Sequence, residues 1–349
     1  MSAEFSKVIA GLLAREPVGA PEVRAAFESI LAGAWTPVQI GAFAVALRMN
    51  GETADVILGA VEALRATMTV VEHGLPLVVD TCGTGGDGSH TLNLSTAAAV
   101  VVAACGIPVA KHGNRSASSL CGSTDVLEAL GIPIGLPAEV QGALLREVGI
   151  VFLFAQTHHA ALKHASQTRS ELGTRTIFNA LGPLANPARA THQLVGVYDD
   201  SLRTVMAQVL GRLGTKRAWV VHSEDGLDEV SPCAPTRVSE LDATGRVREF
   251  VVTPEDFGVA RIPRSAIAGG DVETNARAVR SILGGEPHPA REAIVLGAAA
   301  ALVTATGDDL RASAERARHA IDSKAALGTL ERWRAAAQRA RAKLELAKP

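Results

Sequence analysis

Apolar residues in the first seventy positions recur at the spacing of three to four that places them on one face of a helix. Thr36-Pro37 is a helix-start signal, and the apolar positions 40–47 follow it up to the stop signal Asn50-Gly51. Thr53 then precedes a second apolar series over 56–68. We therefore expect an N-terminal region made of helices.

The pattern changes at Leu75, where short apolar runs bounded by turn residues begin to alternate with helical periodicity. The predicted strands are 75–79, 107–110, 151–155 and 218–222, and the predicted helices between them include 95–105, 123–130 and 158–168. The later elements are a hairpin of 238–241 with 247–252, then helices from 272 onward that end in a surface helix over 331–346. This alternation predicts an α/β fold, with a small all-helical N-terminal domain and a larger α/β domain whose mainly parallel central sheet is flanked by helices.

Composition narrows the class of protein. The chain has 349 residues, enough for about two domains, and its 47% hydrophobic and 20% charged residues exclude a disordered chain. Lys and Arg number 34 against 36 Asp and Glu, and a net charge of −2 lacks the basic excess of a nucleic-acid binder. The longest apolar runs, 97–110 and 293–305, are shorter than the roughly 18–20 residues of a membrane-spanning helix. We expect neither a nucleic-acid nor a membrane partner.

The expected compartment is the cytoplasm. The N-terminus lacks the long apolar segment of a secretory signal. The four cysteines form no C-x-x-C pair and no disulfide framework, which favours a reducing environment.

The densest polar stretch, Asp80–Thr96, follows the first predicted strand. Its glycines match G-x-G-x-x-G at 83–88, but Lys111-His112 stand where a dinucleotide site needs an acid, and the Gly-Lys-Ser/Thr of a P-loop is missing. A phosphate site is favoured, because glycines let N–H groups approach an anion and Ser95-Thr96 are expected to cap a helix whose N-terminus attracts negative charge. Asp87 within the stretch indicates a ligand that also carries hydroxyls or a metal.

Two further polar segments follow predicted strands. Lys111–Ser119, leading to Ser123, combines two cations with several hydroxyls at the end of the second strand, where ligands of open α/β sheets bind. Glu224–Glu229 carries four carboxylates, which repel one another unless a cation lies among them, and hard oxygen ligands facing phosphates suit Mg²⁺. A solvated loop and an ordinary acidic turn are the alternatives.

A fourth polar segment begins at Gln156 and includes two adjacent histidines. His158 and His159 do not indicate zinc, because neighbours on a helix point to different faces and no third ligand has a matching spacing. Arg169 lies ten residues beyond His159, so we expect the two on about the same face of a continuous helix.

Taken in order, four motifs resemble those of the anthranilate phosphoribosyltransferases, a family of the nucleoside phosphorylase/phosphoribosyltransferase fold. They are Gly83–Asp87 with Asn93–Thr96, Lys111–Arg115, Arg175–Asn179 with Gly182–Leu184, and Asp225–Glu229. The resemblance implies Mg²⁺-dependent transfer of the 5-phosphoribosyl group from phosphoribosyl diphosphate to the amine of anthranilate, the second step of tryptophan biosynthesis. It also implies a homodimer joined through the helical domain. That domain would be residues 1–72 with a central segment near 168–190, and the α/β domain would be 73–349.

Position by position, the resemblance implies three groups of site residues. Phosphoribosyl diphosphate would be bound by Gly83, Gly86, Asp87, Thr91, Asn93, Ser95, Thr96, Lys111, His112, Gly113, Asn114, Arg115, Ser116, Ala117, Ser118, Ser119 and Ser123, with 111–119 forming a loop that closes over it. Anthranilate would be bound by Gly83, Asn114 and Arg169, with His112, His159 and Pro183 lining its tunnel. Two Mg²⁺ ions per monomer would be held, one by Ser95 with Glu229 and one by Asp228 with Glu229. No dedicated acid or base is implied, since an aromatic amine needs little activation.

The sequence departs from the family pattern at Cys121, Ala160 and Gly297, where a small polar residue, Pro and Asn are common. A nucleoside phosphorylase of the same fold is the first alternative. Its loop would be expected to read Lys-His-Ser-Gly-Arg-Gly, and it needs no Asp228-Glu229 pair. A non-enzymatic nucleic-acid-binding relative is the second, and the net charge of −2 with the retained carboxylates disfavours it.

Overall fold

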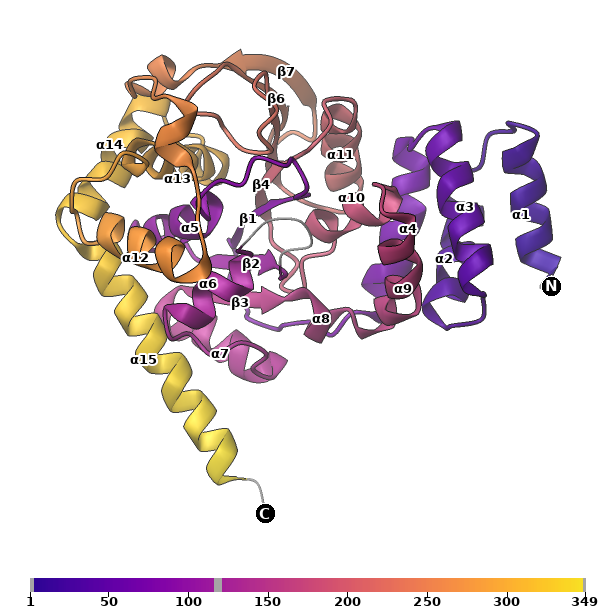
Figure 1. Cartoon of the computed structure of the whole chain (residues 1–349), viewed down its shortest axis with the longest axis horizontal. Helices are drawn as coiled ribbons and strands as arrows, with labels where there is room; N and C mark the ends of the chain where they lie inside the picture. The colour runs from indigo at the N-terminus through magenta and orange to yellow at the C-terminus, as the bar shows by residue number, and fades with distance from the viewer. Residues whose placement is uncertain (1–2, 116–120, 348–349) are drawn as a thin grey trace.

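The structure is a computed structural model that describes residues 3–115 and 121–347. It begins with four helices, α1 (Ala3–Leu13), α2 (Ala20–Leu31), α3 (Pro37–Asn50) and α4 (Ala54–Thr67), which lie together at one end of the molecule (Figure 1). Thr36 caps α3, because its hydroxyl accepts the Gln39 N–H while the Gln39 side chain accepts the Thr36 N–H. The Thr53 hydroxyl caps α4 by accepting the Val56 N–H at 3.4 Å, so both predicted helix starts are confirmed.

A seven-stranded sheet forms the centre of the larger part, with the order β3-β2-β1-β4-β5-β6-β7. The strands are β1 (Val79–Gly83), β2 (Val109–Gly113), β3 (Ile150–Phe154), β4 (His192–Gly196), β5 (Arg217–Ser223), β6 (Thr236–Leu241) and β7 (Val247–Val252). Strands β1 to β5 are parallel, whereas β6 and β7 form the predicted hairpin and pair antiparallel. The predicted fold class is confirmed: a helical N-terminal domain and an α/β domain with a mainly parallel sheet.

Two strands are displaced from their predicted positions. The expected strands 75–79 and 107–110 are in fact Val79–Gly83 and Val109–Gly113. The apolar runs end early because the carboxyl halves of these strands carry polar residues that are nevertheless buried, such as Asp80 and Lys111. Strand β4 was not predicted at all, since it opens with the buried polar pair His192-Gln193.

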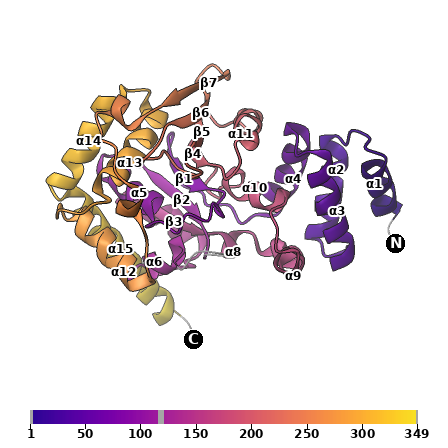
Figure 2. The same cartoon turned by 45° about the horizontal axis from the view of Figure 1, so that its top comes forward.

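Helices cover both faces of the sheet. Along the chain these are α5 (Leu94–Ala104), α6 (Ser123–Ala129), α7 (Ala138–Val148), α11 (Ser201–Arg212), η2 (Pro254–Phe257), η3 (Arg264–Ile267), α12 (Val272–Leu283), α13 (Arg291–Thr306), α14 (Leu310–Asp322) and α15 (Ala325–Leu346). Figure 2 shows α5 and α13 on one face and α11 on the other. Strand β5 supplies both cores by alternation, since Trp219 and Val221 pack with α5 and α13 whereas Ala218 and Val220 pack with α11.

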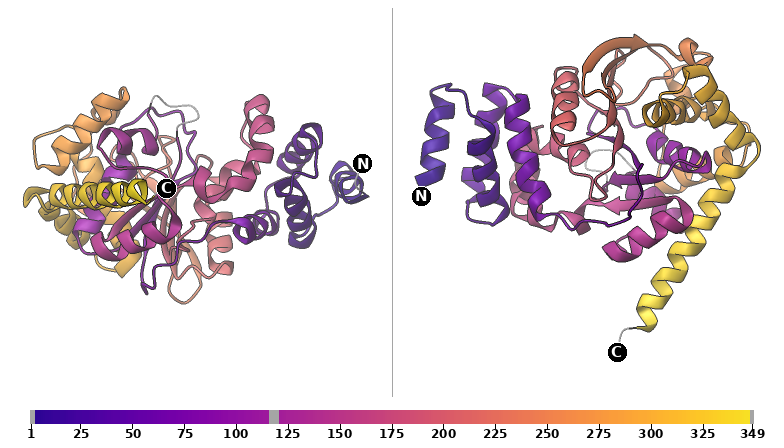
Figure 3. Two further views of the ribbon diagram at one scale, coloured as in Figure 1. Left: turned by 90° about the horizontal axis from the view of Figure 1, so that it is seen from below. Right: turned by 180° about the vertical axis from the view of Figure 1, so that it is seen from behind.

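The last helix is longer than the surface helix predicted over 331–346. Trp333 near its middle is only 2% exposed and belongs to the core around α5 and α13. Beyond that anchor α15 runs outward to the C-terminus, as Figure 3 shows. No helix in the described part of the chain has the length and apolar character needed to span a membrane.

The expected continuous helix over 158–168 is wrong. The chain instead forms α8 (Ala155–His158), the short η1 (Ala160–Leu162) and α9 (Lys163–Leu172), because His159 adopts φ −119° and ψ 50° and leaves the helical conformation. The inference that His159 and Arg169 share one helix face therefore fails. Helix α9 packs against α2 and α3, and the following α10 (Ile177–Leu184) packs against α4.

Candidate functional site

The polar segments singled out in the sequence meet at the carboxyl ends of the parallel strands. Gly83 ends β1 and begins the glycine loop, here residues 83–88, while the acidic loop, residues 224–229, follows β5. The two loops touch, since the Gly85 N–H donates to Asp228 Oδ2 at 2.8 Å. A Cβ atom on Gly83 would lie 2.6 Å from the same oxygen, and a Cβ atom on Gly196 would lie 1.4 Å from the Asp228 carbonyl oxygen. Glycine is thus required where the acidic loop crosses β1 and β4.

The glycine loop presents backbone donors. Gly85, Gly86 and Gly88 have φ of +67°, +75° and +72°, a conformation that favours glycine. Within the described residues, the N–H groups of Gly86, Asp87 and Gly88 donate to no acceptor. The Asp87 carboxylate accepts the Ser89 N–H at 3.0 Å, which folds the loop back on itself. Successive free N–H groups of this kind suit a phosphate or diphosphate.

Helix α5 starts at this loop, but its N-terminus differs from the prediction. Asn93, rather than Ser95-Thr96, occupies the N-cap position, and its side chain makes no capping bond. Instead Asn93 Oδ1 accepts from Asn275 Nδ2 at 3.1 Å and from the Cys121 thiol at 3.4 Å. The unusual Cys121 therefore keeps a hydrogen bond to Asn93. The expected site residue Thr91 lies just before, where it pairs with Ala268 in an isolated β-bridge.

The resemblance implied that Lys111, His112 and Gly113 lie in the loop that closes over phosphoribosyl diphosphate, but these three residues complete β2 instead. The Lys111 ammonium is buried and donates to the Thr81 carbonyl and to Ser95 Oγ, the latter at 3.2 Å. The loop begins only at Asn114. Of its expected residues, Ser116, Ala117, Ser118 and Ser119 lie outside the part of the chain that the structure describes.

The described ends of that loop are tied to α6. Ser123 Oγ donates to the Asn114 carbonyl at 3.1 Å. Arg115 forms ion pairs with Asp125 at 2.6 Å and Glu128 at 2.9 Å. The Arg115 cation is thus directed to the carboxylates of α6 in this conformation.

The four carboxylates of the acidic loop divide into two pairs. Asp225 accepts the Ser223 and Ser231 hydroxyls and shapes the turn, while the exposed Glu224 pairs with Arg237 at 3.6 Å. The remaining two, Asp228 and Glu229, are half-buried and form no ion pair with another described residue. Burial and then Asp87 raise the pKa of Asp228, and burial and then Asp228 raise the pKa of Glu229.

Partly desolvated carboxylates that repel one another fit a divalent cation. No set of three or more His, Cys, Asp or Glu residues within the described ranges is arranged to hold a metal alone. Mg²⁺ needs only one or two protein carboxylates, because waters and substrate phosphates complete its octahedron. The donor set Asp228, Glu229 and Ser95 therefore fits Mg²⁺ bound together with a phosphorylated ligand.

The region around His112 and His159, here called the histidine compartment, lies beside α10. The rings of His112 and His159 are 5.1 Å apart, and His112 Nδ1 bonds the carbonyl of Gly182, the neighbour of Pro183, at 2.9 Å. His112 Nε2 and both ring nitrogens of His159 are buried and have no hydrogen-bond partner among the described residues. Burial lowers the pKa of His159 to about 4 and that of His112 well below its ordinary value, so both rings are neutral at pH 7.

Arg169 reaches the same helix from α9. Its Cζ atom lies 5.7 Å from the centre of the Phe178 ring, and burial lowers the pKa of the guanidinium. It makes no ion pair with another described residue, nor does any hydrogen bond or ring contact join it to Asn114, His112 or His159. Arg169 and His112 thus contact the same helix, α10, but they do not contact each other.

Two residues of the site region were given no role from the sequence. Arg175 stacks on the Tyr198 ring beside the glycine loop. Arg175 belongs to a motif that carries the resemblance, but Tyr198, the only tyrosine of the chain, gave no signal of its own.

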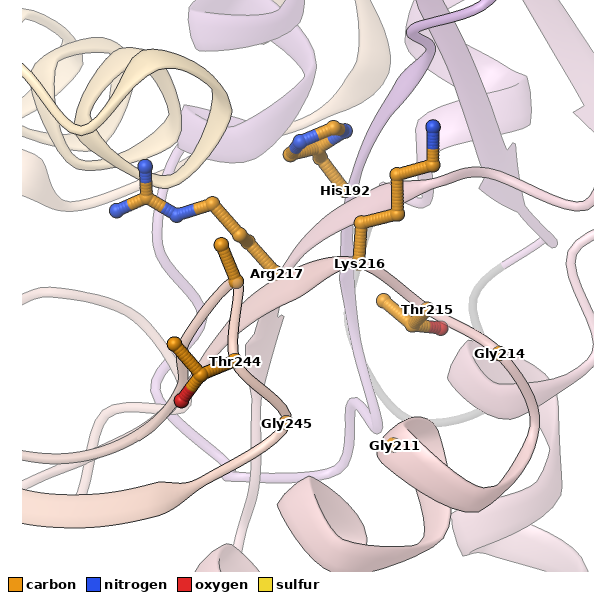
Figure 4. A pocket seen from close by; sticks show the side chains of 9 residues that line it. His192, Gly211, Gly214, Thr215, Lys216, Arg217, Thr244 and Gly245 are labelled. Atoms are coloured by element: carbon orange, nitrogen blue, oxygen red, sulfur yellow. The ribbon is translucent and has the colours of Figure 1, made fainter.

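An open cavity in the described part of the chain lies elsewhere. It measures about 420 Å³. Figure 4 shows lining residues that include His192, Lys216, Arg217 and Thr244. His192 and Arg217 begin β4 and β5, so this cavity lies at the amino ends of the parallel strands, opposite the loops described above. In α/β sheets ligands bind at the carboxyl ends, which favours the glycine and acidic loops as the functional site.

Comparison with known proteins agrees with this architecture. Residues 6–68 match the helical bundle domain of a glycosyl transferase family, and residues 75–327 match the α/β domain of a glycosyl transferase family. The fold and the site thus define a two-domain glycosyl transferase. The chain is 52% identical to the anthranilate phosphoribosyltransferase of Myxococcus xanthus over 86% of this chain and 89% of the relative. It is 52% identical to that of Symbiobacterium thermophilum over 92% of this chain and 94% of the relative. The chain belongs to the anthranilate phosphoribosyltransferase family.

Solved structures extend the comparison. The Thermus thermophilus anthranilate phosphoribosyltransferase has a TM-score of 0.89 and 38% identity, covering 95% of this chain and 99% of that one. The Saccharomyces cerevisiae enzyme in complex with PRPP and Mg has a TM-score of 0.90 and 26% identity, covering 97% and 99%. The same yeast enzyme is also known in complex with 4-fluoroanthranilate.

Proposed function

We propose that this chain transfers the 5-phosphoribosyl group of phosphoribosyl diphosphate to the amine of anthranilate, giving N-(5-phosphoribosyl)anthranilate and diphosphate. This is the second step of tryptophan biosynthesis. The observation that carries the proposal is the contact between the glycine loop and the acidic loop at the carboxyl edge of the sheet, made by Gly85 and Asp228. It joins anion donors to a carboxylate pair, and relatives at about half identity carry the corresponding name.

The phosphoribosyl diphosphate would lie between the glycine loop and α5. Its proposed ligands are Gly83, Gly86, Asp87, Thr91, Asn93, Ser95 and Thr96, with Lys111–Ser119 and Ser123 across from them. The free N–H groups of Gly86 and Gly88 support this placement. Lys111 would act partly through Ser95, because its ammonium donates to Ser95 Oγ and leaves the Ser95 hydroxyl hydrogen free to turn toward a phosphate.

The metal site would use Ser95 and Glu229 for one Mg²⁺ and Asp228 with Glu229 for a second. Mg²⁺, when bound, would neutralise charge that develops on the diphosphate. Burial, and after it a neighbouring carboxylate, raises the pKa of Asp228 and of Glu229. A cation beside the two groups would favour their ionised forms against both effects, which supports a metal site here.

Anthranilate would bind in the compartment beside α10, with Gly83 and Asn114 near its amine. Arg169, which has no carboxylate partner in the described ranges, would take the anthranilate carboxylate as a two-pronged fork. His112, His159 and Pro183 would line the path. Neutral imidazoles suit this role, because they add no competing cation.

The reaction needs little proton chemistry from the protein. The bond from the anomeric carbon to diphosphate breaks with its electron pair on the diphosphate, the amine nitrogen bonds to that carbon, and the nitrogen then releases a proton. An aromatic amine is already neutral at pH 7, so positioning and electrostatic stabilisation by the loops supply most of the rate.

The proposal extends to the assembly and the domains. A homodimer is supported by an exposed apolar stripe on α3, where Val38, Val45 and Met49 are 81%, 39% and 72% exposed in the described part of the chain. Their spacing places them on one face, and a second copy of this chain is the occupant we propose.

The helical domain would comprise 1–72 and 168–190, since α10 shares a core with α2 and α3, and 73–349 would form the rest. The cytoplasm is the proposed compartment.

Product analysis tests this function. Purified chain incubated with both substrates and Mg²⁺ should yield N-(5-phosphoribosyl)anthranilate and diphosphate in equal amounts by mass spectrometry. Incubation with inorganic phosphate and pyrimidine nucleosides should release no base. Base release without anthranilate transfer would instead establish the nucleoside phosphorylase alternative.

A further inference from the structure

Arg175 lies between α9 and α10, and no carboxylate within the described residues pairs with its guanidinium. Its Cζ atom lies 4.3 Å from the centre of the Tyr198 ring, so the cation is held by an aromatic face rather than by an ion pair. The side chain is half-buried, which removes part of its water shell. A guanidinium stacked in this way keeps its in-plane N–H donors available to an anion.

The guanidinium also faces the glycine loop. A Cβ atom on Gly86 would lie 3.5 Å from Arg175 Nε and 3.9 Å from Nη2. The N–H of Gly86 itself donates to no acceptor in the described part of the chain. Among the described residues, a cation that lacks an anionic partner and a backbone N–H that lacks an acceptor therefore lie next to each other.

Tyr198 is fixed firmly enough to act as a platform. It is 7% exposed, and its N–H donates to Thr84 Oγ1 at 3.0 Å, which ties it to the glycine loop. The Tyr198 hydroxyl accepts a hydrogen bond from Arg48 Nη1 at 3.3 Å. Since Arg48 belongs to α3, the ring connects the N-terminal helices to the loop that faces the proposed diphosphate.

We propose that Arg175 binds the diphosphate group of phosphoribosyl diphosphate, and that Tyr198 is the positioning residue that holds it there. This inference rests on the proposed function for the identity of the ligand. The diphosphate, rather than the 5-phosphate, is assigned because Gly85, the neighbour of Gly86, donates to Asp228, one of the carboxylates proposed for Mg²⁺. Arg175 would then meet the charge that grows on the leaving group.

The assignment gives Arg169 and Arg175 separate tasks. Arg169 contacts Phe178 of α10 beside the histidine compartment, whereas Arg175 contacts Tyr198 beside the glycine loop. Arg169 would bind the acceptor, anthranilate, and Arg175 would bind the donor, phosphoribosyl diphosphate. Their effects on the two KM values should therefore separate.

The test is Arg175→Met, with Arg175→Lys as the second variant and Arg339→Met as the matched control. Arg339 is exposed on α15 and pairs with Glu147 of α7, an element that carries none of the proposed site residues. Arg175→Met should raise the KM for phosphoribosyl diphosphate about 10- to 100-fold, the loss typical of a charge-assisted hydrogen bond, and lower kcat. The KM for anthranilate should stay within about twofold. Arg175→Lys should recover only part of the loss, because lysine keeps the charge but lacks the planar fork.

A binding measurement separates this inference from the proposed function. Calorimetric titration of the folded wild type with inorganic diphosphate and Mg²⁺, without anthranilate, should give binding that Arg175→Met weakens by a similar factor and Tyr198→Leu weakens less. Unchanged diphosphate binding in folded Arg175→Met would overturn the inference while leaving the transferase proposal intact. A rise confined to the KM for anthranilate would also overturn it. A wild type that binds diphosphate but shows no transfer would instead count against the proposed function.

Discussion

Arg169 and Arg175 stand apart from exposed arginines such as Arg212 and Arg339, which pair with Asp55 at 2.7 Å and Glu147 at 3.0 Å. Each of the two instead contacts an aromatic ring. A partly desolvated cation that lacks a carboxylate gains more from an anionic ligand than a solvated, paired one does. Arginines that lack a carboxylate partner among the described residues thus indicate the site as clearly as its motifs do.

Arg169→Ala should raise the KM for anthranilate about 10- to 100-fold, because it removes the proposed charge-assisted contact with the carboxylate. The KM for phosphoribosyl diphosphate should change by less than about twofold. Steady-state kinetics with each substrate varied in turn measures both values, and Arg212→Ala serves as the control. Equal increases in both KM values would remove Arg169 from the role of acceptor ligand.

The histidine pair predicts how stability depends on pH. Burial lowers the pKa of His159 to about 4 and that of His112 well below its usual range, whereas both would protonate near 6.5 in the unfolded chain. Acid therefore stabilises the unfolded state, and the free energy of unfolding should fall as pH decreases from about 6.5 toward 4, by up to about 1.4 kcal/mol per pH unit for each ring.

Urea unfolding at pH 7.5, 6 and 5 measures this slope, and His159→Gln isolates one ring because glutamine does not titrate. The variant should lose less stability between pH 6 and 5 than the wild type does. Parallel curves for the two proteins would show that His159 remains unprotonated for another reason or is not linked to folding.

At the scale of elements, the site depends on how closely the acidic loop crosses β4. Gly196→Ala would place a Cβ atom 1.4 Å from the Asp228 carbonyl oxygen, so the loop must move. We expect a destabilisation of about 1–3 kcal/mol or more and a higher Mg²⁺ requirement for turnover.

Gly297→Ala is the matched control within the same chain. Its Cβ atom would meet only Ala98 Cβ at 3.5 Å, an ordinary contact, and alanine favours helix α13 by up to about 1 kcal/mol. Thermal unfolding and magnesium titrations of both variants measure the difference. A Gly196→Ala protein with wild-type stability and metal dependence would show that the acidic loop is not held by this crossing.

Elements with local signals were predictable from sequence, and elements defined by tertiary contacts were not. The caps at Thr36 and Thr53 and the hairpin of β6 with β7 follow from neighbouring residues alone. Strand β4 was missed because it opens with His192 and Gln193, which are buried although hydropathy treats them as surface residues. Gln193 is satisfied by donating to the Pro183 carbonyl, a contact that the pattern of the strand does not reveal.

The candidate site shows the same division. The charge pattern of 224–229 did not separate Asp228 and Glu229 from Asp225, which accepts the Ser231 hydroxyl, and only the family resemblance singled out that pair. The burial of Lys111 under Ser95 also has no local signal, since its acceptors come from β1 and α5. The role of a residue that depends on the direction of its side chain could be assigned only from the three-dimensional structure.

For the whole molecule, the N-terminal helices support the site on one side and leave an uncovered apolar face on the other. Arg48 of α3 reaches Tyr198 beside the glycine loop, while Val38, Val45 and Met49 of the same helix are exposed. A second copy covering that stripe would brace α3, and through it the platform under Arg175. Helix α3 would then contribute both to the dimer interface and to the site.

Replacing both Val45 and Met49 by Glu should convert the proposed dimer to a monomer, because two charges would be buried in an apolar contact. Light scattering coupled to gel filtration measures the mass at micromolar concentration. Val251→Glu is the control, since Val251 is 54% exposed on β7 and lies outside the stripe. A monomeric wild type, or a double variant that remains dimeric, would contradict the proposed interface.

The most direct test of the central claim follows anthranilate fluorescence after purified chain, phosphoribosyl diphosphate and Mg²⁺ are mixed. We predict that fluorescence decays only when all three are present, stops on adding EDTA, and slows sharply for Glu229→Gln. Constant fluorescence with folded protein and intact substrates would contradict phosphoribosyl transfer to anthranilate, and decay that persists without Mg²⁺ would contradict the assignment of Asp228 and Glu229.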